Sequence, residues 1–111
     1  MSGVGGRVAT RFATVSYNAG MDRPAGLPGA ELIEAGLVDL ARHVESVPAL
    51  LVAVGAPRLR HLGVAVPETP HDPEHRLYAL LAQDDSNSAH SRYNALIRRL
   101  VSYERALACA S

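Results

Sequence analysis

Residues 88–108 read SAHSRYNALIRRLVSYERALA and carry the longest amphipathic pattern in the chain. Their apolar side chains recur at helical spacing and, at 100° per residue, fall within an arc of about 140°. The arc consists of Tyr93, Leu96, Ile97, Leu100, Val101, Leu107 and Ala108. Arg98 and Arg105 lie just beyond one edge of the arc, and Arg92 and Arg99 beyond the other. The stretch predicts a long helix with one buried side and positively charged flanks.

Two helical segments are expected upstream of it. Residues 30–46 alternate apolar and charged side chains with a helical period, which predicts an amphipathic helix. Ser46 and Pro48 then form a typical helix start, with serine as the cap and proline in the first turn. The run Ala49–Val54 is apolar on every side, so a buried helix and a buried strand both remain open. The serine cap and the proline in the first turn favour the helix.

Glycine and proline divide the middle of the chain. Gly55 is expected to end the second helix, and residues 57–63 to form a short helical turn that Gly63 stops. Asp72 and Pro73 are a typical cap and first residue for the next helix. Together with the last helix, these segments predict an all-α domain, a small compact bundle of about five helices.

The beginning of the chain differs in composition from the rest. Residues 1–21 contain Arg7 and Arg11 but no acidic residue, and glycines and prolines surround them. We expect residues 1–29 to form a flexible N-terminal arm and residues 30–111 the helical domain. Two alternatives stay open: residues 7–17 could form a short edge strand, and translation could start at Met21 instead of Met1.

Length and charge limit the class of protein. The chain has 111 residues, enough for one hydrophobic core, and its eleven basic and eleven acidic residues cancel. A neutral chain lacks the overall electrostatic signature of a protein that binds nucleic acid or an anionic membrane. Its single cysteine cannot form an internal disulfide. The longest uncharged apolar stretch is too short to cross a bilayer. We therefore expect a small cytoplasmic protein with no membrane contact.

Two short histidine motifs were weighed as chemical sites. His71 and His75 have the spacing of two metal ligands on one helix face, but Pro73 places His71 before the first turn. His90 lies next to Ser88 and Ser91, but the sequence has no nucleophile elbow around these serines. We expect no catalytic residue, no metal site and no cofactor, and therefore no enzyme.

Arginines in the middle of the chain suggest a different function. Residues 52–61 loosely follow a helix-turn-helix pattern in which Arg58, Arg60 and His61 would contact DNA. Pro57 and Gly63 leave barely two turns for a recognition helix. A small DNA-binding regulator that uses the corner around Arg58 and Arg60 is therefore kept as the alternative function, and nucleic acid as a less favoured partner.

Glu104 is the unusual residue of the last helix, because it lies near the middle of the apolar arc. A buried, unpaired carboxylate is costly, so three interpretations remain. Glu104 pairs with an arginine of the domain, reaches solvent, or meets a basic group of a partner. Tyrosine and arginine are also common anchors of protein interfaces. We therefore expect a partner to bind at Tyr93, Arg99, Tyr103 and Glu104.

The stretch AHSRYNALIRRLVSYERA, residues 89–106, and residues 31–68 before it resemble small helical proteins of actinobacteria with GC-rich genomes. These proteins are antitoxins that partner nucleotidyltransferase-like toxins. The resemblance covers residues 30–108 and includes no metal or nucleotide motif. It implies a protein without chemistry of its own that binds and neutralises a cognate toxin, encoded nearby, in a toxin-antitoxin system. The lysine-free composition, with eleven arginines, also fits a GC-rich genome.

Overall fold

The computed structural model describes residues 26–110, which form four α-helices and, within that range, no strand. They are α1 (Ala30–Ala41), α2 (Val47–His61), α3 (Pro73–Asp84) and α4 (Ala89–Ala110). The all-α prediction is confirmed, but the expectation of five helices is wrong. The predicted arm falls almost entirely on residues 1–25, which lie outside the described residues, as does the strand considered for residues 7–17.

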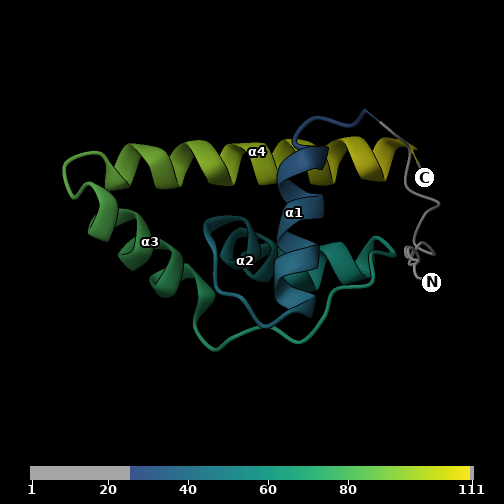
Figure 1. Cartoon of the computed structure of the whole chain (residues 1–111). Helices are drawn as coiled ribbons and strands as arrows, with labels where there is room; N and C mark the ends of the chain where they lie inside the picture. The colour runs from purple at the N-terminus through teal and green to yellow at the C-terminus, as the bar shows by residue number, and fades with distance from the viewer. Residues whose placement is uncertain (1–25, 111) are drawn as a thin grey trace, which may run out of the picture.

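Helix α2 forms the centre of the molecule (Figure 1). It packs against each of the other three helices, and α3 also packs against α4. In Figure 1, α4 runs along the top, α1 crosses in front of α2, and α3 slopes away on the left. Most of α2 is buried, including Leu50, Leu51, Val52 and Leu59. The run Ala49–Val54 is therefore helix, which resolves the helix-or-strand alternative.

The fifth helix is absent because α2 continues through Gly55 and Pro57 to His61. Proline inside a helix removes one hydrogen bond and normally breaks or kinks the helix. Here the next turn brings Leu59 into the core, where it is completely buried. Burial of a leucine side chain contributes about 2 kcal/mol, which helps to offset the loss at Pro57. The turn at Gly63, with φ of 94°, then ends the helix as predicted.

Helix α1 is shorter than expected, because it ends at Ala41 and not near Ser46. His43 adopts a left-handed conformation with φ of 60°, and the Val44 N–H donates back to the Asp39 carbonyl oxygen. This six-to-one hydrogen bond is typical of a helix C-terminus. Val44, expected on the buried stripe, is instead 45% exposed.

Of the two predicted side-chain caps, the structure contains the one at Ser46 but not the one at Asp72. Ser46 caps α2 as predicted, since its hydroxyl oxygen accepts a hydrogen bond of 3.2 Å from the Ala49 N–H. Asp72 precedes α3 but its side chain makes no capping bond, because the residue is left-handed with φ of 54°. A side-chain cap requires an extended backbone at that position. No helix within residues 26–110 is long and apolar enough to span a membrane.

Candidate protein-binding surface

The four residues predicted to bind a partner all lie on α4, but they do not form one surface. Tyr103 is 1% exposed and belongs to the core. The start of α1 lies directly against it, because a Cβ atom added to Gly29 would be 3.8 Å from the Tyr103 Cβ. Tyr103 therefore supports the packing of α1 on α4, and its burial keeps it away from a partner of the folded protein.

Arg99 lies on a different side of α4 from Tyr93 and Glu104. At 100° per residue, Tyr93 and Glu104 are about 20° apart, whereas Arg99 is about 120° from Tyr93. Tyr93 and Glu104 are half-buried and Arg99 is exposed. The helix thus presents two separate flanks, one with Tyr93 and Glu104 and one with Arg99.

On the first flank, Tyr93 contacts an aromatic residue of α3. The ring centroids of Tyr78 on α3 and Tyr93 on α4 are 5.8 Å apart, with an interplanar angle of 56°. Tilted aromatic pairs of this kind add about 1 kcal/mol to the burial of the rings. Burial, and secondly the charge of Glu74, raise the pKa of the Tyr93 hydroxyl above its usual value. The pair joins α3 to α4.

Glu104, on the same flank, lies over the backbone of α2. Its Oε2 atom would be 3.0 Å from a Cβ atom added to Gly55. Burial raises the pKa of this carboxyl above its ordinary value, and the positive charge of Arg58 lowers it only in part. Within residues 26–110, Glu104 makes neither an ion pair nor a hydrogen bond. Of the three interpretations of Glu104, pairing with an arginine of the domain is therefore not seen among residues 26–110: Arg58 is nearby, but it forms no ion pair with Glu104.

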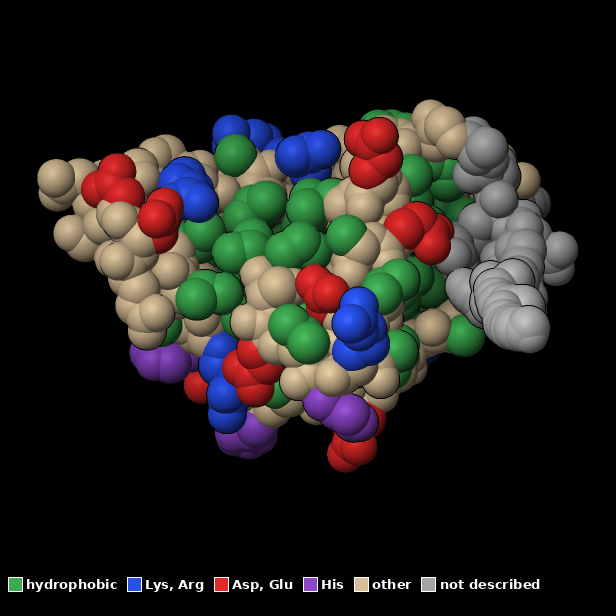
Figure 2. Space-filling view, in the orientation of Figure 1, with side chains coloured by type: hydrophobic (Ala, Val, Ile, Leu, Met, Phe, Trp, Pro, Cys, Tyr) green, Lys and Arg blue, Asp and Glu red, His purple; other side chains and the backbone are tan. Residues whose placement is uncertain are grey.

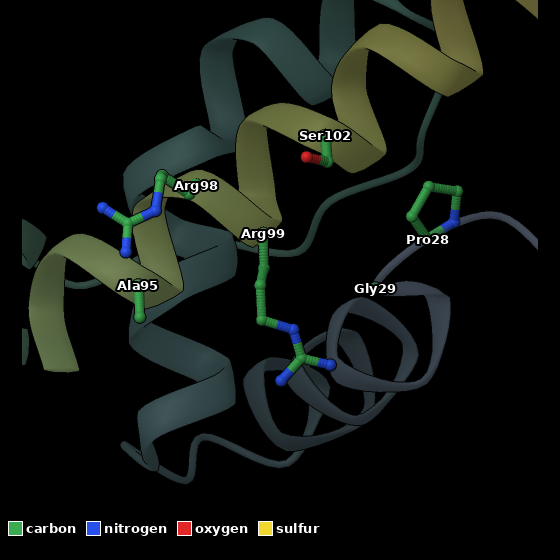
Figure 3. Close-up of a pocket in the computed structure, with 6 residues that line it drawn as sticks. All are labelled: Pro28, Gly29, Ala95, Arg98, Arg99 and Ser102. Carbon is green, nitrogen blue, oxygen red and sulfur yellow. The ribbon is translucent and has the colours of Figure 1, made fainter.

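The second flank, around Arg99, borders a groove of about 370 Å³ between α4 and the start of α1. The groove is lined by Pro28, Gly29, Ala95, Arg98, Arg99 and Ser102 (Figure 3). Figure 3 shows the Arg99 side chain extending toward α1, whereas the Arg98 side chain points the other way. Neither arginine has an acidic partner among the described residues, whereas Arg92 pairs with Asp84 at 2.7 Å.

Next to this groove is a surface of hydrophobic side chains framed by α1, α3 and α4 (Figure 2). We call this surface the apolar face. From the positions argued below, we assign to it four of the half-buried hydrophobic residues that pack against the core: Leu32, Val47, Leu80 and Leu96.

Leu32 is seven residues before Asp39 and therefore on the same side of α1. Asp39 accepts a 2.6 Å hydrogen bond from the Ser46 hydroxyl, so this side faces the start of α2, where Val47 lies. Leu80 lines a small depression together with Leu50 of α2.

Leu96 belongs to the Arg99 flank of α4. The helical period places it about 60° from Arg99 and on the same side as Arg92. The apolar face and the groove are therefore continuous along α4. Charged residues surround the hydrophobic patch in Figure 2.

Arg58 and Arg60, the candidate DNA contacts, do not lie on a separate recognition helix, because residues 47–61 form one continuous helix. Arg60 Nη2 donates hydrogen bonds to the carbonyl oxygens of Val66 and Pro67, at 3.3 and 2.9 Å. These bonds hold the segment that follows α2. Arg58 is exposed near Glu104.

The histidines considered as chemical sites have local contacts. Arg76 Nε donates to the His71 carbonyl oxygen at 2.6 Å, and His90 Nε2 is 3.2 Å from Asn94 Nδ2. The structure groups no three histidine, cysteine, aspartate or glutamate residues between 26 and 110 closely enough to hold a metal ion.

Comparisons of the chain with family models, curated proteins and solved structures found no match.

Proposed function

We propose that this chain is a non-enzymatic protein-interaction module, and specifically an antitoxin that binds and neutralises a nucleotidyltransferase-like toxin encoded nearby. The proposal places the protein in the cytoplasm of an actinobacterium. Two supports of different kinds carry it. The apolar face supports the interaction module, and the resemblance of residues 30–108 supports the antitoxin.

The single observation that carries the interaction module is the apolar face between α1, α3 and α4 (Figure 2). Protein interfaces combine an apolar centre with a polar rim. Exposed hydrophobic patches rimmed by polar residues are typical of protein-binding sites. Here the half-buried leucines supply the centre, and the charged residues around them, Arg92 and Arg99 included, supply the rim. Binding of a partner would remove the remaining apolar surface from water, at about 25 cal/mol per Å².

Co-expression tests the proposal. The full chain is produced together with the product of the neighbouring gene, and cell growth and complex formation are measured. We expect the native chain to restore growth and to co-purify with the toxin. Substitution Leu96→Ser should weaken both effects, because it places a hydroxyl in the centre of the apolar face.

A matched control comes from Val38, which is 53% exposed on a different side of α1, about 120° from Leu32 and about 100° from Asp39. Val38→Ser should leave growth rescue unchanged. Circular dichroism melting of both variants confirms that each is folded at the growth temperature. A folded Leu96→Ser variant that rescues growth as well as the native chain contradicts the proposed interface, and the absence of any complex contradicts the proposed function.

A further inference from the structure

Charge is distributed unevenly between α4 and the rest of the described chain. Helix α4 contains four arginines and one glutamate, a net charge of +3. Residues 26–88 contain four arginines and nine acidic residues, a net charge of −5. Among residues 26–110, net positive charge is therefore concentrated on α4, beside the apolar face.

The groove between α4 and the start of α1 has side chains that can bind carboxylates. Arg98, Arg99 and Ser102 line its α4 side, and all three are exposed. Guanidinium groups bind carboxylates through paired hydrogen bonds, and a serine hydroxyl donates one more. Neither arginine is neutralised by an acidic residue within 26–110, so both are available. The groove of about 370 Å³ accepts a few side chains, not a whole domain.

We propose that the partner docks an acidic, amphipathic segment on this side of α4. One of its carboxylates binds Arg99 and Ser102 in the groove, and a second binds Arg98, whose side chain points away from α1. Its apolar side chains cover the apolar face. This inference rests on the proposed interaction function and adds the chemical class of the partner. A helix with leucines on one side and glutamates on the other meets both requirements.

Two other occupants fit the charges less well. A nucleic acid would also bind the arginines, but its extended row of phosphates would run onto the surface of residues 26–88, where acidic residues outnumber basic ones by nine to four. Residues 1–25 of this chain carry three arginines and one aspartate, so they share the positive sign of the groove. A short acidic segment brings its carboxylates only to the arginines of α4 and covers the other helices with its apolar side.

A pair of synthetic peptides tests the inference on the full-length protein. The probe is a labelled helical peptide of about 18 residues with leucines on one side and glutamates elsewhere, and its analogue replaces every glutamate by glutamine. Binding is followed by fluorescence anisotropy at low salt. We expect the acidic peptide to bind about tenfold or more tightly than the glutamine analogue, with an advantage that shrinks as salt is added.

Substitution Ala95→Glu blocks the groove with the protein's own carboxylate. Residue 95 lies one turn before Arg99, the spacing at which glutamate and arginine pair on a helix, so the fold is retained. This variant should bind the acidic peptide about tenfold more weakly than the native protein does. The control Ala108→Glu adds the same charge to an exposed position on α4 outside the groove and should change binding less than about twofold.

The outcomes separate this inference from the function on which it rests. If both peptides bind equally well and the Leu96→Ser variant binds neither, the apolar face is still a binding surface, but the inference of an acidic partner is wrong. An equal effect of Ala95→Glu and Ala108→Glu also overturns it, because net charge alone would then explain binding. If the acidic peptide does not bind, the inference of an acidic partner is wrong. The interaction module is then still tested by the co-expression experiment. Duplex DNA that displaces the acidic peptide assigns the arginines to nucleic acid instead.

Discussion

Gly36 of α1 packs directly against the carbonyl oxygen of Pro48 in the first turn of α2. A Cβ atom on residue 36 would collide with this backbone oxygen and with the Val52 side chain. The absence of a side chain on Gly36 therefore sets how closely the two helices cross. This crossing brings the Leu32 side of α1 beside Val47 and so builds one wall of the apolar face.

Gly36→Ala is predicted to destabilise the protein by about 2–3 kcal/mol, because a backbone carbonyl cannot move aside as a side chain can. Gly55→Ala is the matched control. Its Cβ would meet mainly the methyl groups of Leu100, at 2.8 and 2.9 Å, which can rotate away. Alanine also favours the helix by about 1 kcal/mol over glycine, so this variant should remain within about 1 kcal/mol of the native protein. Urea denaturation compares the two, and equal losses would contradict the backbone contact.

His43→Gly is predicted to stabilise the protein by about 1 kcal/mol. His43 has φ of 60°, a conformation that costs a residue with a side chain about 1 kcal/mol and costs glycine almost nothing. The residue is exposed, so little packing is lost. His61→Gly, inside the last turn of α2, should lower stability, since there glycine weakens a helix. Thermal unfolding measures both variants: the melting temperature should rise for His43→Gly and fall for His61→Gly. A lower melting temperature in both variants would contradict the left-handed conformation of His43.

Glu104→Gln is predicted to raise the free energy of unfolding at pH 7. Folding raises the pKa of Glu104 above its ordinary value of 4.5, chiefly through burial. A carboxyl group whose pKa rises on folding stabilises the folded state below its unfolded pKa, and this contribution is lost as pH increases through the folded pKa. The advantage of glutamine should therefore shrink as the pH falls through the raised pKa of the folded protein toward 4.5.

Urea denaturation at neutral and acidic pH measures this difference, with Glu31→Gln as an exposed control on α1. A Glu104→Gln variant that is less stable than the native protein at pH 7 would contradict the prediction. It would mean that the ionised carboxylate is held by a favourable contact in the folded protein.

The amphipathic patterns predicted the helices but not every end of them. The arc of α4 and the start of α2 at Ser46 followed from local sequence, because spacing and capping act between near neighbours. The passage of α2 through Pro57 did not, since it depends on the burial of Leu59 by the whole fold. Local propensity is overridden by tertiary packing at such positions.

The candidate surface was predictable only in part. Helical spacing alone separates Arg99 from Tyr93 and Glu104, so the two flanks of α4 could have been distinguished from the sequence. The burial of Tyr103 could not, because it follows from the contact with Gly29, more than seventy residues earlier in the chain. The groove and the apolar face likewise join residues of different helices, and only the fold brings them together.

Hydrogen–deuterium exchange of the full chain, alone and in complex with the product of the neighbouring gene, shows which surface the partner covers. We expect slower exchange on binding in residues 95–102 and around Leu32, Val47 and Leu80, which belong to the groove and the apolar face. Exchange in residues 57–66, around Arg58 and Arg60, should stay unchanged. Protection confined to residues 57–66, or to none of the residues 26–110, would contradict the assignment of this surface to partner binding.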